Sequence, residues 1–513
     1  MLAAAEETRS TVPASAKVAA ALLIALALCG RAIYVFTPVN SDTAMFVYAG
    51  KLVANGGRPG VDLLDNKLPS VGLLMQVPER LFGAAWPTYG LLGLAMSVVA
   101  SLMLWRLARR WLGESAAIFV AVASVLWLNF TPAVYGQLQL ETIGVFFSAL
   151  AAGCVAEWLA KRDLRDAFVA GMCGGMGMWA KPTAGAVLAA AVIAMLLFAR
   201  GRWWPRIAGI YALAAGAALP IIVCLKLILA TGMAGALPET LRQLRDYAAA
   251  SNFDWSDVAK PIFVVAVLLF PLLILGLICR RDRLPRQPRP SGLGAFVLIW
   301  FGCELAAVIS QRRMYAYHFI VLAPPAALLC GLIARRVSMR SLQMAFGPPT
   351  ALAFWLAMTM VPQIGAPTRD SRMIAYVKAN ALPTQSVWVD DYPRLLMETD
   401  LAPGSAVPLI FLFANSDSAP AFFGERLLAD FDARRPAMVI LPTDIDRLIE
   451  LYHHNMADVA GSPRRAEAMG RMIRQIDGYV RRRYHPAAEI DGLTVWQRDS
   501  ATIPAQAVPP TGR

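Results

Sequence analysis

The feature that most constrains this chain is a series of apolar runs, each close to the length of a membrane-spanning helix. A spanning helix needs about 20 mostly apolar residues. Such runs occupy residues 17–37, 88–107, 115–134, 141–160, 207–230, 261–279, 292–310, 318–334 and 343–361. Between Asp166 and Arg200 a longer apolar stretch contains Lys181-Pro182, where we expect two short helices to meet. The sequence therefore predicts a polytopic α-helical membrane protein with about eleven transmembrane helices.

The composition is that of a protein that resides in lipid. Of the 513 residues, 57% are hydrophobic and only 16% are charged, as in membrane proteins. A net charge of +13 would suggest nucleic acid in a soluble protein. Here, however, the arginines and lysines lie mostly between apolar runs, where membrane topology explains them. We expect membrane lipid and no nucleic acid as a partner.

The positions of arginine and lysine predict the orientation, because cytoplasmic loops retain positive charge. One alternate set of loops holds Arg106, Arg109, Arg110, Lys161, Arg162, Arg165, Arg200, Arg202, Arg206, Arg280, Arg281, Arg283, Arg286, Arg289, Arg335, Arg336 and Arg340. The other set is longer and less basic, notably 38–87 and 231–260. We expect a bacterial inner-membrane protein whose N-terminus is cytoplasmic and whose residues after Pro362 are periplasmic.

The C-terminal part has the pattern of a soluble domain. Short β-like runs, SVWVDD, AMVILP and LTVWQR, alternate with charged helical stretches at 446–457 and 463–484, which predicts a small α/β domain. We divide the chain into a transmembrane domain, residues 1–364, and a periplasmic domain, residues 365–513. The end of the latter, rich in Pro and Ala, is expected to be disordered. We assign this domain no catalytic role.

The first outer loop, residues 38–87, predicts two interfacial amphipathic helices, the first opened by Asp42 and closed by Asn55-Gly56-Gly57. Asp42 is either a helix N-cap or a general base that takes the proton of a hydroxyl acceptor. Lys67 is either a lysine that snorkels to the interface or a cation that neutralises a phosphate. Asp65 lies beside it.

Two further charges lie at or within the apolar runs. Glu141 opens a helix on the outer side, where an acidic residue interacts favourably with the helix dipole; the alternative is a catalytic role. Lys181 is the only charge in its apolar stretch, and an ionisable group inside a membrane is a functional candidate by default.

The outer loop SQRRMYAYHFIVLAPP contains Arg312, Arg313, Tyr315, Tyr317 and His318. Adjacent arginines in an outer loop oppose the positive-inside trend, so an anionic phosphate is expected to compensate them. The alternative is an aromatic anchor whose arginines touch lipid phosphate. With two carboxylates and several cations, the outer face suits transfer from a sugar phosphate: cations stabilise the departing phosphate and a carboxylate activates the acceptor.

The order and sidedness of these residues resemble the membrane-embedded glycosyltransferases of the C-type fold, particularly the branch of lipid A aminoarabinose transferase and the protein O-mannosyltransferases. That family has an Asp after the first span, a Lys-Pro-Pro-like motif, an acidic residue opening the fourth span, an interrupting Lys and a late basic-aromatic motif. These features fall on Asp42, Lys67 in DNKLPS, Glu141, Lys181 in WAKPT and Arg312 to His318. The resemblance covers about residues 15 to 360.

The resemblance implies a polyprenyl-phosphate sugar donor and inverting transfer to a lipid, glycan or protein-hydroxyl acceptor of the cell envelope. Asp42 is then the base, and Glu141 the second catalytic candidate. The residues expected to bind the donor phosphate are Lys67, Lys181, Arg312 and Arg313. Those expected to line the substrate cavity are Asp65, Tyr315, Tyr317 and His318. Some relatives hold a divalent metal near the acidic residues, but we predict neither a metal nor another cofactor.

Two departures from the family pattern and two other functions stay open. Leu68 replaces the first Pro of the usual pair, and His318 is followed by Phe, so donor recognition is expected to differ. A transporter or flippase of a lipid-linked sugar would favour repeated halves and polar groups near the midplane, and the sequence shows neither. A non-enzymatic sensor or scaffold would leave the outer-face charges unexplained.

Overall fold

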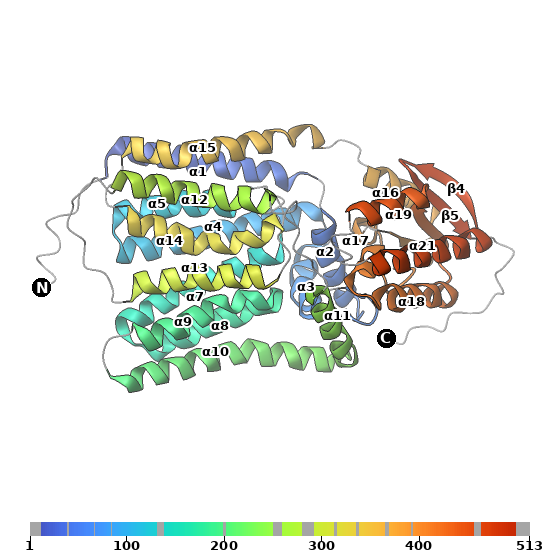
Figure 1. The fold of residues 1–513 in the computed structure, drawn as a ribbon, viewed down its shortest axis with the longest axis horizontal. Coiled ribbons are helices and arrows are strands. Elements are labelled where there is room, and N and C mark those ends of the chain that lie inside the picture. Colours follow the sequence, from blue (N-terminus) through green and yellow to red (C-terminus); the bar gives the residue numbers. More distant parts are fainter. Residues whose placement is uncertain are drawn as a thin grey trace, which may run out of the picture. The chain divides into compact units, whose positions relative to one another are not determined.

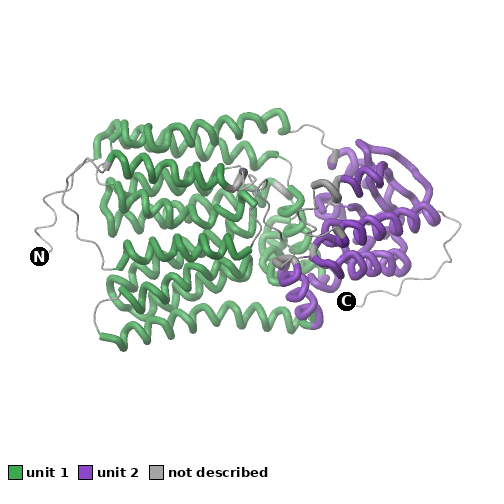
Figure 2. The backbone as a smooth tube through the Cα atoms, viewed as in Figure 1, with its two compact units in different colours: residues 1–55, 69–234, 253–366 green, residues 56–68, 235–252, 367–513 purple. Residues whose placement is uncertain are grey.

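The chain folds into two compact units in a computed structural model (Figures 1 and 2). The structure describes residues 12–37, 40–65, 67–83, 85–130, 138–198, 202–249, 259–279, 292–311, 315–334, 338–364, 369–390, 393–455 and 463–498. The first unit comprises residues 1–55, 69–234 and 253–366, and the second comprises 56–68, 235–252 and 367–513. Two segments that interrupt the first unit along the chain therefore belong to the second. The expected disordered end lies outside the described residues.

The helices of the first unit follow the predicted apolar runs. Within the described ranges they are α1 (Ala14–Val35), α4 (Trp86–Trp111), α5 (Glu114–Leu128), α7 (Leu140–Lys161), α8 (Leu164–Ala180), α9 (Ala186–Leu197), α10 (Trp203–Ala230), α12 (Ala259–Cys279), α13 (Leu293–Ser310), α14 (Ala323–Ile333) and α15 (Met339–Met358). Seven described segments are long and apolar enough to cross a membrane, and three shorter apolar ones accompany them. The predicted polytopic α-helical fold is confirmed.

Close backbone packing joins neighbouring helices of this bundle. A Cβ atom on Gly171 of α8 would lie 2.0 Å from the Leu213 carbonyl oxygen, and one on Gly216 of α10 would lie 2.0 Å from that of Phe168. Glycine lets two helices approach closely, and such contacts hold helices together where the surroundings are as apolar as their side chains. The α8–α10 contact therefore depends on these two positions.

Two shorter helices, α2 (Ser41–Ala54) and α3 (Ser70–Phe82), lie at one end of this bundle (Figure 1). Asn40 caps α2, because its side-chain oxygen accepts the Thr43 N–H at 2.8 Å. Asp42 instead lies in the first turn, so its interpretation as the N-cap is wrong. The helix ends at Ala54, as the predicted Asn55-Gly56-Gly57 stop requires.

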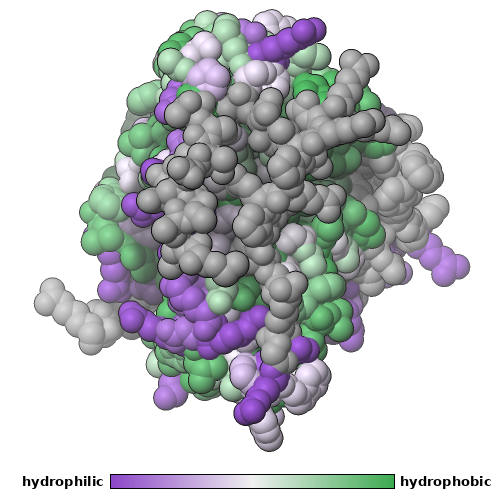
Figure 3. All heavy atoms as spheres, turned by 90° about the vertical axis from the view of Figure 1, so that its left-hand side faces the viewer, coloured by the Kyte–Doolittle hydropathy of each residue, from purple (hydrophilic) through white to green (hydrophobic). Residues whose placement is uncertain are grey.

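The opposite end of the bundle carries basic residues held in ion pairs. Arg109 lies 3.2 Å from Glu114, and Glu157 accepts both Arg110 at 3.0 Å and Lys161 at 2.9 Å. Figure 3 looks onto this end and shows hydrophilic residues among hydrophobic ones. These are the loops whose charge predicts the cytoplasmic side.

The second unit contains a five-stranded sheet in the order β2-β1-β3-β5-β4. Its strands are β1 (Ser386–Val389), β2 (Ala402–Pro403), β3 (Met438–Pro442), β4 (Tyr484–Ile490) and β5 (Leu493–Arg498). β1 pairs in parallel with β2 and β3, whereas β5 pairs antiparallel with β3 and β4. The three predicted β runs form β1, β3 and β5, and the predicted small α/β fold is confirmed.

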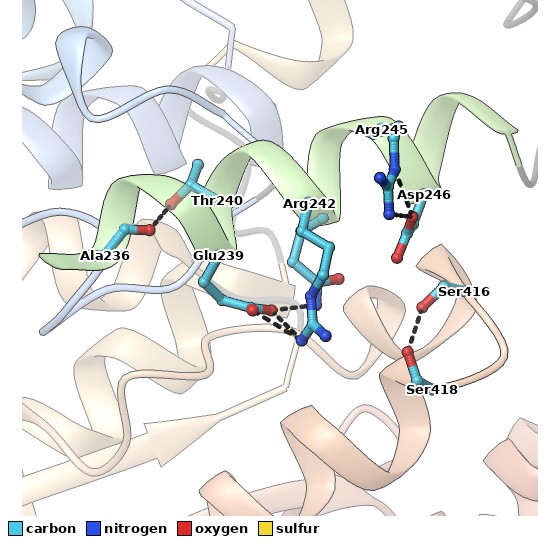
Figure 4. Close-up of polar contacts among 9 residues, drawn as sticks. Ala236, Glu239, Thr240, Arg242, Arg245, Asp246, Ser416 and Ser418 are labelled. Carbon is cyan, nitrogen blue, oxygen red and sulfur yellow. Dashed lines mark hydrogen bonds and ion pairs between the residues drawn. The ribbon is translucent and has the colours of Figure 1, made fainter.

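Helices pack around this sheet. They are α16 (Arg369–Asn380), α17 (Pro393–Glu398), α18 (Ala419–Arg434), α19 (Ile445–Asn455) and α21 (Pro463–Arg483). α11 (Leu237–Ala249) also belongs to this unit (Figure 2). The Arg242 guanidinium lies 5.9 Å from the centroid of the Phe422 ring. Glu239 accepts hydrogen bonds from Arg242 at 2.9 Å and Gln243 at 2.7 Å (Figure 4). Residues 235–249, which follow α10, are thus part of the second unit.

Candidate functional site

Glu141 and Lys181 form a buried ion pair at the end of the bundle where α7 begins and α8 ends. Glu141 lies in the first turn of α7, and Lys181 follows α8 at the point where Pro182 starts a short 3-10 helix. The Lys181 Nζ is 2.5 Å from Glu141 Oε1, and the two side chains are 20% and 4% exposed. Proline cannot donate a backbone hydrogen bond, which explains the break at this position. The predicted meeting of two helices at Lys181-Pro182 is confirmed.

His318, with two tyrosines beside it, lies close to Glu141. They come from the 3-10 helix η5 (Ala316–Leu322) and from the residue before it. His318 Nε2 is 3.6 Å from Glu141 Oε1, and the His318 ring meets that of Tyr317 edge-on with centroids 4.7 Å apart. Tyr315 stacks on Tyr317 at 5.5 Å. The structure thus brings Tyr315, Tyr317 and His318 together with the Glu141–Lys181 pair.

The first turn of α2 is fastened to the start of α7, which brings the two predicted catalytic carboxylates onto adjoining helix starts. The Thr43 hydroxyl donates a hydrogen bond to the Leu138 carbonyl at 3.2 Å and accepts one from the Gln139 amide at 3.3 Å. Asp42 directly precedes Thr43 and is half-buried, and Glu141 follows Gln139 by two residues. Their convergence on one end of the bundle therefore has a specific structural cause.

The start of α3 is bound to the end of α8. The Ser70 hydroxyl donates to the Trp179 carbonyl at 2.8 Å, two residues before Lys181. Lys67 and Asp65 precede Ser70 along the chain but belong to the second unit, where both are half-buried.

Two predicted site residues, Arg312 and Arg313, lie outside the described residues. In the parts of the chain that the structure describes, no three His, Cys, Asp or Glu side chains gather closely enough to hold a metal ion.

The comparisons with known proteins agree with this architecture. Residues 67–226 match the family model described as dolichyl-phosphate-mannose-protein mannosyltransferase. ArnT from Cupriavidus metallidurans, solved bound to undecaprenyl phosphate, is similar with 14% identity, a TM-score of 0.57, and coverage of 96% of this chain and 100% of that one. Archaeal oligosaccharyltransferase AglB from Archaeoglobus fulgidus, solved with an inhibitory peptide and a dolichol-phosphate, is similar with 12% identity, a TM-score of 0.51, and coverage of 95% and 75%.

This chain has the C-type glycosyltransferase fold. The fold-level part of the predicted resemblance is thereby confirmed. No curated protein sequence matches the chain. The segment that matches the family model begins at Lys67 and includes Glu141 and Lys181, three of the positions on which the resemblance was based.

Two ionisable residues of this C-type fold escaped the sequence interpretation. Arg31 is fully buried within α1, and Glu304 of α13 is 1% exposed. The Trp300 indole donates to Glu304 Oε1 at 2.9 Å, while Oε2 is buried without a hydrogen-bond partner among the described residues. The signal that singled out Lys181, a charge within an apolar run, applies to both residues.

Proposed function

We propose that this protein transfers a sugar from a polyprenyl-phosphate donor to a cell-envelope acceptor at the periplasmic face of a bacterial inner membrane. The C-type fold supports a glycosyltransferase, and the family model that matches residues 67–226 is named for a dolichyl-phosphate-sugar reaction. The two similar structures hold a polyprenyl phosphate or a dolichol-phosphate, and one also holds a peptide. Polyprenyl phosphate is therefore the donor class with the best support.

The observation that carries the proposal is the cluster of Glu141, Lys181 and His318 beside the helix start that bears Asp42. Placing an ion pair at a helix break inside an apolar bundle costs free energy, because both charges are removed from water. Ionisable groups kept in such surroundings usually have a function. The stacked Tyr315 and Tyr317 rings offer an apolar surface of the kind on which sugar rings pack. Charge and aromatic surface lie together here.

The proposed reaction is a single inverting displacement. The acceptor oxygen forms a bond to the anomeric carbon as the bond from that carbon to the phosphate oxygen breaks, and polyprenyl phosphate leaves with the electron pair. Asp42 takes the proton of the acceptor hydroxyl. The anomeric carbon becomes oxocarbenium-like and charge builds on the departing phosphate, which is where cations assist.

Lys181 and Lys67 are proposed to bind the donor phosphate. Lys181 uses one of its three N–H donors on Glu141, which leaves two for a phosphate and fixes the direction of the side chain. Lys67 precedes Ser70 by three residues, so chain length alone keeps its Cα within about 11 Å of the Ser70 Cα. The proposed role of Lys67 as a second phosphate ligand rests on its place in the motif DNKLPS.

The proposed orientation follows from the two ends of the bundle. The end opposite Glu141 carries the arginines and the one lysine of the α4–α5 and α7–α8 turns, as expected of a cytoplasmic side. The donor would then be used on the outer face.

The test is sugar transfer by an Asp42→Asn variant in membranes. Removal of a general base typically costs 10²- to 10⁴-fold in rate, so we expect a loss of about that size with folding unchanged. Asp166→Asn is the matched control, because Asp166 also lies in a first helical turn, that of α8, but outside the proposed site. Wild-type transfer by Asp42→Asn would refute the assignment of the base.

A lipid-linked-sugar flippase is the second candidate, because the structure contains a broken helix pair at Lys181. Transporters often place such breaks at their binding sites. A flippase would move the donor across the membrane and leave its sugar–phosphate bond intact, which separates the two functions experimentally.

A further inference from the structure

Residues 58–63, which precede Lys67 in the second unit, form a compact turn. The Asp62 carboxylate accepts the Arg58 backbone N–H at 2.9 Å and the Arg58 Nε at 3.1 Å. The Gly60 N–H donates to the Leu63 carbonyl at 2.7 Å, and Gly60 has φ +86°, a conformation that favours glycine. The turn is therefore closed by its own hydrogen bonds up to the residue before Leu64.

Leu64 attaches this turn to the C-terminal domain. Its backbone N–H donates a hydrogen bond to the Ala406 carbonyl at 2.7 Å. Its side chain packs against the hydrophobic core of that domain, which includes Trp388, Phe431 and Val439. Leu64 and Ala406 are 342 residues apart in sequence, so the domain supplies a tertiary anchor three residues before Lys67.

Asp430 of α18 binds Ser405 and Ala406, the segment to which Leu64 is hydrogen-bonded. This carboxylate is 6% exposed, and its Oδ2 accepts the Ala406 N–H at 2.7 Å and the Ser405 hydroxyl at 2.9 Å. Its Oδ1 accepts the Arg426 Nε at 3.0 Å. Because a buried carboxylate is stabilised only by such donors, Asp430 and the backbone at Ala406 hold one another in place.

We propose that Asp430 is a positioning residue through which the C-terminal domain sets the conformation of residues 58–64 and thereby constrains Lys67. The inference rests on the proposed role of Lys67 in binding the donor phosphate. A cation on a pre-ordered segment binds an anion without first losing the conformational freedom of the segment. The domain therefore acts on donor affinity.

The structural part of the proposal is tested by hydrogen exchange on the full-length protein in lipid nanodiscs. In Asp430→Ala, peptides that contain Leu64 should exchange about tenfold faster, the effect of losing roughly one hydrogen bond. Asp430→Asn keeps an acceptor for Ala406 and should show a smaller change. Asp432→Asn is the matched control, because Asp432 lies one half-turn along α18 and binds Tyr479 and Arg483. Unchanged exchange at Leu64 in Asp430→Ala would overturn the proposal.

The functional part is tested by steady-state transfer from a synthetic polyprenyl-phosphate sugar. Asp430→Ala should raise the KM for the donor about tenfold with kcat within a factor of about three, and Asp430→Asn should restore most of the affinity. A fall in kcat at unchanged KM would indicate general damage and overturn the role in donor positioning. If the wild type transfers no sugar, the proposed function fails, and the exchange data alone still decide whether Asp430 orders residues 58–64.

Discussion

Replacing Lys181 by methionine should destabilise the bundle by about 3 kcal/mol, because it leaves the Glu141 carboxylate buried without its main partner. At 2.5 Å and an effective dielectric constant of about 20, the attraction is about 7 kcal/mol, and the desolvation of both charges offsets much of it. Removing one partner of a buried pair costs about 3–5 kcal/mol. His318, 3.6 Å from the same oxygen, can compensate in part, so we expect the lower end of this range.

The assay is a double-mutant cycle in mixed micelles, with the unfolding free energies of Lys181→Met, Glu141→Gln and the double variant measured by detergent titration. The double variant should lose less than the sum of the single losses, with a coupling energy above about 1.5 kcal/mol. Lys161→Met is the control, because Lys161 pairs with Glu157 at 2.9 Å but is 53% exposed; its loss should stay below about 1 kcal/mol. Single losses that add within about 0.5 kcal/mol would refute the reasoning.

Two further predictions concern helix packing and pH. Gly171→Ala should lower the melting temperature in detergent, because its Cβ would meet a backbone oxygen at 2.0 Å and overpacking costs about 1–3 kcal/mol. The control is Gly276→Ala, which should leave the melting temperature unchanged because its Cβ meets no atom within 4 Å. Equal melting temperatures for the two variants would contradict the close α8–α10 contact. The hydrogen bond from Tyr479 holds the pKa of Asp432 below its ordinary 3.8, so Asp432 stabilises the fold above about pH 4 and loses this effect as the pH falls further. Asp432→Asn should therefore be slightly less stable than the wild type at pH 7 and equal to it near pH 2 in thermal melts, whereas a constant difference would exclude this linkage.

Much of the first unit could be predicted from sequence because its signals are local. An apolar run near 20 residues long has few alternatives to a spanning helix, and Pro182 breaks the helix where the structure shows a break. The start of α2 does not follow from the sequence, because Asn40, Ser41 and Asp42 are all good N-cap residues; in the structure Asn40 accepts the Thr43 N–H.

Site residues could be predicted where a charged residue interrupts an apolar run. Contacts between residues far apart in the sequence could not. Glu141 and Lys181 were both marked by their apolar surroundings, whereas nothing local pairs Leu64 with Ala406. The β4 strand cannot be recognised from the sequence either, because its residues are mostly exposed and few of them are hydrophobic. Arg31 and Glu304 were detectable by the rule that selected Lys181 and were overlooked within long apolar runs.

The most direct test of the central claim is to follow a polyprenyl-phosphate sugar, labelled in the sugar, in proteoliposomes that contain the purified protein and a cell-envelope acceptor. We predict that the wild type moves the label to the acceptor and releases free polyprenyl phosphate, and that Asp42→Asn does neither at a comparable rate. A donor that crosses the bilayer with its sugar–phosphate bond intact, in the wild type and in Asp42→Asn alike, would contradict the account and favour a flippase.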